Sequence, residues 1–211
     1  MIWADWIPNL LLAWGVQSVG VLSPGPGVAL ILGVALSEGR RASVITCLGI
    51  SMAAVVLATL AVLGLAAVLA GMETAMTAVR WIGAAYLGWL AIGAFRKAAA
   101  PPAPPKAREV SVKGSAALMV KGFTMQMANP KAIFYWIAVG AVAGLESAPL
   151  PVIGLFLIGG WAISFFGHGT WAILLSSAPF RALYASARRW VEAALGGFFA
   201  FAAFKLATME D

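Results

Sequence analysis

Two short stretches, Ser23-Pro24-Gly25-Pro26-Gly27 and Ala128-Asn129-Pro130-Lys131, interrupt the two longest apolar segments of the chain. These segments run over residues 7–36 and 115–145, which is 30 and 31 residues. A straight helix of that length measures about 45 Å, whereas the hydrocarbon core of a bilayer is about 30 Å thick. Proline and glycine at this density do not sustain an α-helix. We therefore predict two broken helices, with irregular backbone at residues 23–27 and 128–131.

The composition places the chain in a membrane. Apolar residues make up 62% of the 211 residues and charged residues only 10%, against about 25% charged residues in a soluble domain. A soluble chain of this size could not remove so much apolar surface from water. Disorder requires the opposite composition. The sequence therefore predicts an all-α integral membrane protein that lies in a lipid bilayer.

Six apolar segments are each long enough to cross a bilayer. They cover residues 7–36, 42–70, 75–95, 115–145, 150–177 and 190–209. A proline-rich stretch at 98–114 separates the third segment from the fourth, and its Pro-Pro-Ala-Pro-Pro core favours an extended chain. We expect six transmembrane helices, with a three-helix unit at 1–97, a cytoplasmic linker at 98–114 and a second three-helix unit at 115–211.

The two halves resemble each other. Residues 78–97 and 187–206 are identical at nine positions without gaps, at an offset of 109 residues, and the match includes an Arg-Trp pair. The two breaks have a similar offset, since Pro26 and Pro130 are 104 residues apart. Three crossings is an odd number, so consecutive halves have opposite orientations. The sequence thus predicts two inverted three-helix repeats, a pattern that in transporters indicates a binding site near the midplane.

The positive charges predict the orientation. The stretches after the first, third and fifth segments hold ten basic residues: Arg40, Arg41, Arg96, Lys97, Lys106, Arg108, Lys113, Arg181, Arg188 and Arg189. Loops rich in Lys and Arg stay on the cytoplasmic side. We therefore expect a multi-pass protein of the cytoplasmic (inner) membrane with both termini non-cytoplasmic. The net charge of +6 is then a topology signal, and no nucleic-acid partner is predicted.

The breaks are the candidate binding site. Irregular backbone at membrane depth must face protein, water or a ligand. The helices that start near Val28 and at Pro130 would direct their positive dipole ends at the breaks, and Asn129 suits an N-cap. Two such ends favour the binding of a carboxylate. The alternative interpretation is that the breaks are simple kinks without a binding role. The candidate substrate-binding residues are Pro24, Gly25, Pro26, Gly27, Gln126, Asn129, Pro130 and Lys131.

Two residues are candidates for ion coupling. A lysine inside the membrane is costly and rarely faces lipid. Lys131 therefore pairs with a substrate carboxylate or loses its proton in transport; alternatively, it satisfies carbonyls of the opposite break. His168 is the one histidine of the chain. An imidazole with an ordinary pKa of about 6.5 suits a proton relay; alternatively, it is a neutral ring bonded to a neighbouring helix.

The apolar part of a substrate would contact Phe134, Tyr135 or Trp136.

The sequence lacks the residues needed for disulfide formation, metal binding or the common enzyme motifs. The one cysteine, Cys47, and the one histidine form neither a disulfide nor a metal site. Walker A, HExxH and GxSxG motifs are absent. We expect no enzyme, no metal and no cofactor, so any pumping would use an ion gradient or a partner.

Several motifs resemble those of the lysine-exporter (LysE/RhtB) family of amino-acid exporters. They are SPGPGVALIL (23–32) with EGRRAS (38–43) and CLGISMA (47–53), WIGAAYLGWLAIGAFR (81–96), KGFTMQMANPKAIFYW (121–136) and the C-terminal stretch 174–207. The pairing of Pro-Gly-Pro with Asn-Pro-Lys is the most specific of these signals. The stretch AVGAVAGLESAPL (138–150) departs from the Pro-x-Phe pattern of many family members.

The resemblance implies a translocator that exports amino acids or their derivatives across the cytoplasmic membrane, driven by the proton motive force. It maps residues 24–26 and 129–131 onto the family motifs. Two alternatives stay open: a metal-cation exporter of the same superfamily, for which intramembrane carboxylates and thiolates are lacking, and a non-transporting membrane partner protein. A homo-oligomer is compatible with the sequence.

Overall fold

The computed structural model describes residues 6–23, 25–69, 73–100, 114–145 and 147–208, and these residues form helices and connections without any β-strand. The described part of the chain contains α1 (Ile7–Leu22), α2 (Pro26–Ser37), α3 (Gly39–Leu69), α4 (Glu73–Ala99), α5 (Ser115–Met127), α6 (Pro130–Ala143), α7 (Leu150–Leu175) and α8 (Ala178–Ala207). The predicted all-α class is confirmed.

Both long apolar segments are broken where proline and glycine interrupt them. The axes of α1 and α2 meet at 50°, and α5 is separated from α6 at residues 128–129. The breaks are shorter than predicted, because Pro26 and Pro130 are each the first residue of the following helix. A proline is well accommodated there, since the N–H that it lacks would have no partner within the helix.

Four helices, α3, α4, α7 and α8, are long and apolar enough to cross a membrane, and the count rises to five if the bent pair α1–α2 is one span. This agrees with the multi-pass membrane class. The shorter α6 is apolar but has only 14 residues.

The sixth predicted segment begins too late. A loop was expected up to residue 189, whereas α8 starts at Ala178. Ser177 caps this helix, with its hydroxyl accepting from the N–H of Phe180 at 3.4 Å. The charged residues in this stretch are compatible with helix, and Arg188 Nε lies 3.9 Å from Glu192 one turn later. A drop in hydropathy therefore did not mark a helix end here. Of the predicted linker, residues 101–113 lie outside the described residues.

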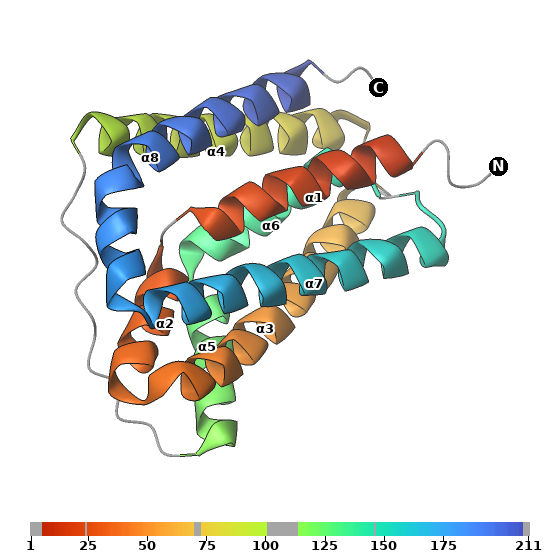
Figure 1. The fold of residues 1–211 in the computed structure, drawn as a ribbon. Coiled ribbons are helices and arrows are strands. Elements are labelled where there is room, and N and C mark those ends of the chain that lie inside the picture. The colour runs from red at the N-terminus through yellow and green to blue at the C-terminus, as the bar shows by residue number, and fades with distance from the viewer. Residues whose placement is uncertain (1–5, 24, 70–72, 101–113, 146, 209–211) are drawn as a thin grey trace.

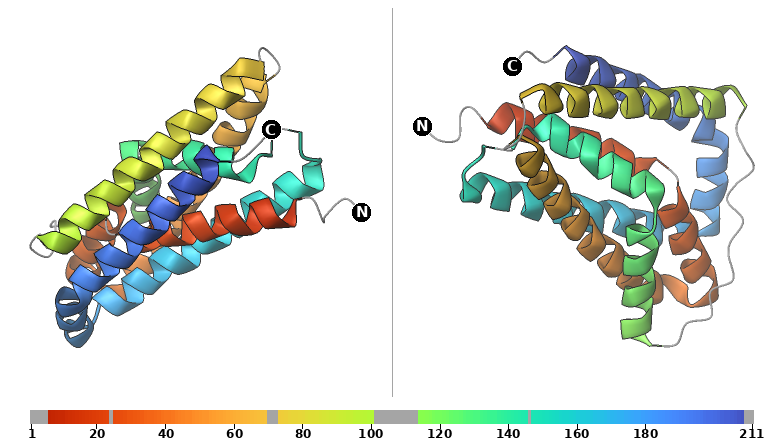
Figure 2. Two further views of the ribbon diagram at one scale, coloured as in Figure 1. Left: turned by 90° about the horizontal axis from the view of Figure 1, so that it is seen from above. Right: turned by 180° about the vertical axis from the view of Figure 1, so that it is seen from behind.

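The two halves of the chain interleave (Figures 1 and 2). The helix α3 packs on α5 and α6, whereas α7 packs on α1 and α2. The helices α3 and α7 also contact each other, and α4 lies antiparallel along α8. Each broken pair is thus held by a long helix of the other half. This arrangement brings the two breaks, which are distant in sequence, to the interior between the halves.

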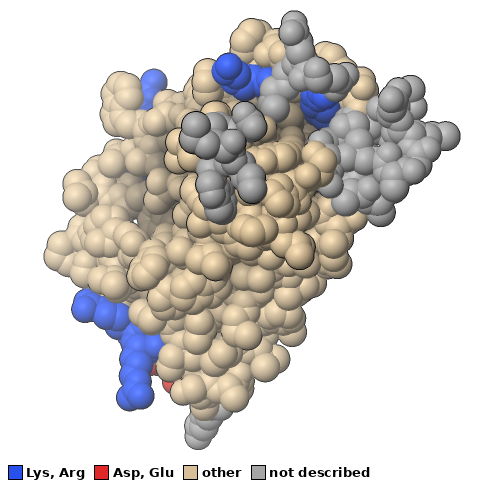
Figure 3. All heavy atoms as spheres, turned by 90° about the vertical axis from the view of Figure 1, so that its right-hand side faces the viewer, with Lys and Arg blue, Asp and Glu red and all other residues tan. Residues whose placement is uncertain are grey.

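The connections segregate to two sides. In Figure 1 the outer ends of α1 and α8 and the α6–α7 connection lie at the right, whereas the α2–α3 and α7–α8 connections lie at the left and bottom. Figure 3 looks onto the right-hand side and shows mainly uncharged residues there, with Lys and Arg in a few separate places.

Candidate functional site

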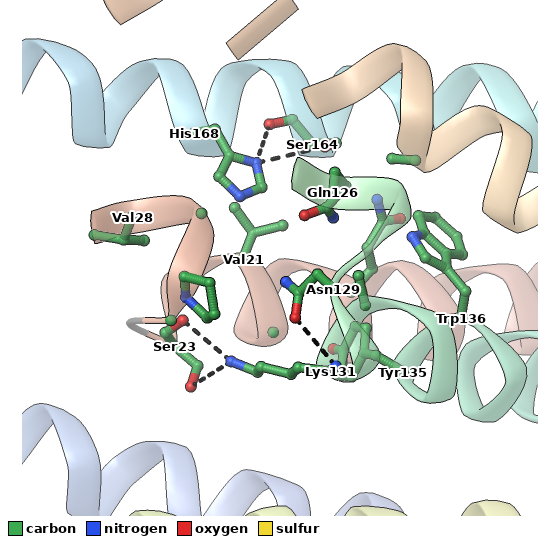
Figure 4. A pocket seen from close by; sticks show the side chains of 17 residues that line it. Val21, Ser23, Val28, Gln126, Asn129, Lys131, Tyr135, Trp136, Ser164 and His168 are labelled. Carbon is green, nitrogen blue, oxygen red and sulfur yellow. Dashed lines mark hydrogen bonds between the residues drawn. The ribbon is translucent and has the colours of Figure 1, made fainter. Parts of the chain in front are cut away.

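The two breaks meet around one cavity of about 60 Å³, which we call the central cavity (Figure 4). A water needs about 10–15 Å³ of such volume, so the space holds about four to six waters. Seven of the residues predicted for substrate binding or ion coupling line it: Gly25, Pro26, Gly27, Gln126, Asn129, Lys131 and His168. Pro130 starts α6 but does not line the cavity, and Pro24 lies outside the described residues.

The N-termini of α2 and α6 both border this cavity. Asn129 is the N-cap of α6, as predicted, and its Oδ1 accepts the N–H of Lys131 at 3.1 Å. Gly25 is the N-cap of α2 and has extended backbone, with no side chain to fill the space in front of Pro26. The first N–H groups of a helix carry partial positive charge. The cavity is therefore electropositive on two sides.

Lys131 connects the two breaks. Its Nζ donates to the carbonyl oxygen of Ser23 at 3.3 Å and to the Ser23 hydroxyl at 3.1 Å, across 108 residues of sequence (Figure 4). The carbonyl of Lys131 accepts from the hydroxyl of Tyr86 at 2.9 Å. Lys97 and Glu192 are near enough to interact with the ammonium electrostatically. The ammonium thus provides a hydrogen-bond donor to polar groups at the opposite break, as the structural interpretation of this lysine predicted. Lys131 also lines the cavity.

His168 is bonded to its own helix rather than to a neighbouring one. Its Nδ1 lies 2.8 Å from the carbonyl oxygen of Ser164 and 3.4 Å from the Ser164 hydroxyl. A carbonyl only accepts, so Nδ1 carries a proton and Nε2 of the neutral ring is an acceptor. A Cβ placed on Gly27 would lie 3.5 Å from Nε2. The free nitrogen therefore faces the start of α2.

Gln17 is a lining residue that the predicted set omitted. Its Nε2 donates to the carbonyl of Gly160 at 2.6 Å. Its Oε1 is buried, and no donor reaches it among the described residues. The available signal was a glutamine inside an apolar helix, where each polar side chain needs a partner. Ser164, one turn before His168, was likewise missed.

The largest apolar side chains of the lining come from α6. Tyr135 and Trp136 line the cavity and are buried. The hydroxyl of Tyr135 donates to the carbonyl of Val16, which fixes the ring against α1. Phe134 points away, with 51% of its surface exposed. Of the three aromatic residues expected to contact substrate, two therefore line the cavity, and their contact with a substrate stays a prediction.

Replacing Asn129 with alanine is expected to destabilise the protein by about 1 kcal/mol, because the N–H of Lys131 would lose its acceptor at the helix start. Thermal unfolding in detergent measures this loss. Asn129→Asp keeps the acceptor and should retain most of the stability. A melting temperature unchanged in Asn129→Ala would show that the cap contributes little.

No group of three or more His, Cys, Asp and Glu residues that could hold a metal ion occurs in the described ranges. The described lining of the central cavity contains a lysine and no carboxylate. The site therefore suits an anionic group better than a metal cation.

The family model described as LysE type translocator matches residues 18–210. A threonine efflux protein of Escherichia coli is 33% identical over 57% of this chain and 59% of its own length. A cysteine/O-acetylserine efflux protein of Salmonella paratyphi A is 31% identical over 79% of this chain and 82% of its own length.

A membrane protein of Vibrio cholerae is 34% identical over 63% of this chain. The match spans 62% of the Vibrio protein, so it covers less than two thirds of that relative. No solved structure matches the chain.

Proposed function

Since the chain belongs to the LysE type translocator family, we propose that it is a secondary-active exporter of amino acids or close derivatives, driven by the proton motive force across the cytoplasmic membrane. The observation that carries this proposal is the meeting of two broken helices and one lysine around an internal cavity. A translocator binds its cargo without converting it, so no enzymatic role is proposed.

The proposed architecture has six crossings in two inverted repeats. Each half has the same order of elements, a broken pair followed by two long helices. The antiparallel α4 and α8 and the exchanged contacts of α3 and α7 support a twofold relation between the halves. In this topology both termini are outside the cytoplasm, and the linker at 98–114 is inside.

The substrate carboxylate binds between the N-termini of α2 and α6. Lys131 exchanges its bonds to Ser23 for the carboxylate, and the Asn129 cap holds its backbone at the start of α6. The bond to Ser23 has one ionised partner, whereas the bond to the carboxylate joins two opposite charges, so the Coulombic attraction favours the exchange. It also frees Ser23 and thereby loosens the contact between the breaks.

The rest of the substrate meets the opposite wall. The unpaired Oε1 of Gln17 accepts from the substrate ammonium, and Tyr135 and Trp136 contact its apolar atoms. A cavity of about 60 Å³ favours small side chains. Threonine and cysteine, which are named for two relatives, belong to this class.

Coupling to protons is assigned to Lys131 and His168, the two basic side chains in the described lining of the central cavity. The Lys131 ammonium lies on α6 and the His168 imidazole on α7, and both helices belong to the second half of the chain. Proton transfer at either group changes the charge of the cavity and therefore its affinity for a carboxylate.

An efflux assay tests the function. Cells that lack their own exporters are loaded with dipeptides, and mass spectrometry follows each free amino acid in the medium with and without a proton uncoupler. We expect release of a few small amino acids, abolished by the uncoupler and absent from cells without the protein. Release of none, with the protein folded in the membrane, would overturn the proposal and favour metal export, tested by metal tolerance, or a partner role, tested by pull-down.

A further inference from the structure

A second cavity of about 340 Å³, which we call the side cavity, adjoins the central one. The two share four lining residues, Ser23, Gly25, Pro26 and Lys131. The other lining residues of the side cavity come from one stretch of α4, Trp89–Lys97. The side cavity thus leads from the breaks to the C-terminal end of α4, which adjoins the linker.

Three cations line the side cavity: Arg96, Lys97 and Lys131. Its described lining contains no acidic residue. Glu192, which interacts electrostatically with Lys131, is paired with Arg188 and does not line it. A cavity walled by like charges concentrates counter-ions and speeds their binding. The preferred occupant is therefore an anionic group.

Lys131 and Ser23 stand at the boundary between the two cavities. Each lines both, and the two hydrogen bonds from Nζ to Ser23 join the breaks there. An anion passing from the side cavity to the central cavity would take the place of Ser23 on the ammonium. The contact therefore lies on the direct route between the two cavities.

We propose that the side cavity is a loading site, in which Arg96 and Lys97 bind the substrate carboxylate before it passes to Lys131. This inference rests on the proposed export function and adds a separate site to it. The side cavity is more than five times the size of the central one, so a substrate can enter it with part of its hydration shell. An anionic lipid headgroup has the same chemistry, and the experiment separates the two sources.

Thiol labelling measures the charge of the side cavity without any transport. In a Cys47→Ala background the chain has no other thiol, and Gly93→Cys introduces one in the lining, where a Cβ meets nothing within 4 Å. The thiol is modified in proteoliposomes of phosphatidylcholine by methanethiosulfonates that carry either a sulfonate or a trimethylammonium group. The rate ratio of the two reagents is normalised to that of free 2-mercaptoethanol.

We expect the normalised ratio to favour the sulfonate by roughly tenfold and to fall close to one in Arg96→Gln/Lys97→Gln. A matched control, Lys121→Gln, removes a cation outside both cavities and should leave the ratio unchanged. A ratio near one with Arg96 and Lys97 present would overturn the proposal.

The occupant is identified by protection and by transport. An exported amino acid should slow the labelling, and Arg96→Gln/Lys97→Gln should raise KM several-fold with kcat unchanged. Labelling that slows only when phosphatidylglycerol is added would assign the site to lipid and overturn the loading role. If the wild-type protein exports nothing, the export function fails, whereas charge-selective labelling still reports an anion site.

Discussion

Replacing Lys131 with methionine is expected to lower export by roughly 10- to 100-fold. Methionine keeps an unbranched side chain and removes the ammonium. A hydrogen bond to a charged group is worth about 1.5–3 kcal/mol, and each 1.4 kcal/mol is about a factor of ten. The loss should appear mainly in kcat/KM for amino-acid release from loaded vesicles. Ser23 loses its partner at the same time, so the contact between the breaks weakens in the variant.

Two variants separate the charge from its position. Lys131→Arg keeps the positive charge and should retain part of the activity, whereas Lys121→Met removes a lysine of α5 that lines neither cavity and should be neutral. Size-exclusion profiles establish that each variant is folded. Full export by folded Lys131→Met would show that the ammonium does not hold the carboxylate, and the structural role toward Ser23 would then be its only one.

Alanine at Gly49 and Gly122 is expected to destabilise the protein by about 2 kcal/mol or more, since overpacked sites typically cost about 1–3 kcal/mol each. The backbones of α3 and α5 touch at these glycines. A Cβ on Gly49 would overlap the carbonyl of Met119, and a Cβ on Gly122 would overlap the carbonyl of Thr46. Small residues permit this close approach of membrane helices, so either methyl group forces α3 and α5 apart.

The measurement is thermal unfolding of the purified protein in detergent. A loss of 2 kcal/mol corresponds to roughly 4–8 °C in a chain of this length. Gly64→Ala is the matched control on α3, because a Cβ there meets nothing within 4 Å. Alanine also favours helix over glycine, so the control should be as stable as the wild type or slightly more so. Equal melting temperatures for Gly49→Ala, Gly122→Ala and Gly64→Ala would contradict a backbone contact between the helices.

The membrane class and the places of the breaks could be predicted because they depend on local composition. Proline and glycine end a helix wherever they occur in sufficient number. For the same reason the cap of α6 was predictable, since an Asn-Pro pair meets the needs of a helix start by itself. The start of α8 was missed because charged residues lower hydropathy without breaking a helix.

The position and lining of the two cavities depend on how the helices pack together. Nothing local places Ser23 beside Lys131, which is 108 residues away, or gives Gln17 an unpaired oxygen in the cavity wall. The charges of Arg96 and Lys97 were predicted as signals of topology, and only the position of α4 relative to the breaks brings them to a cavity.

The sequence by itself therefore determined that this chain enters a membrane, where two of its helices break and which helix ends are electropositive. The tertiary structure decided which break faces which and what each polar side chain meets there. The physical reason is that helix breaks and caps are formed by neighbours in the chain, whereas a cavity is the space left between helices whose contacts join distant parts of it.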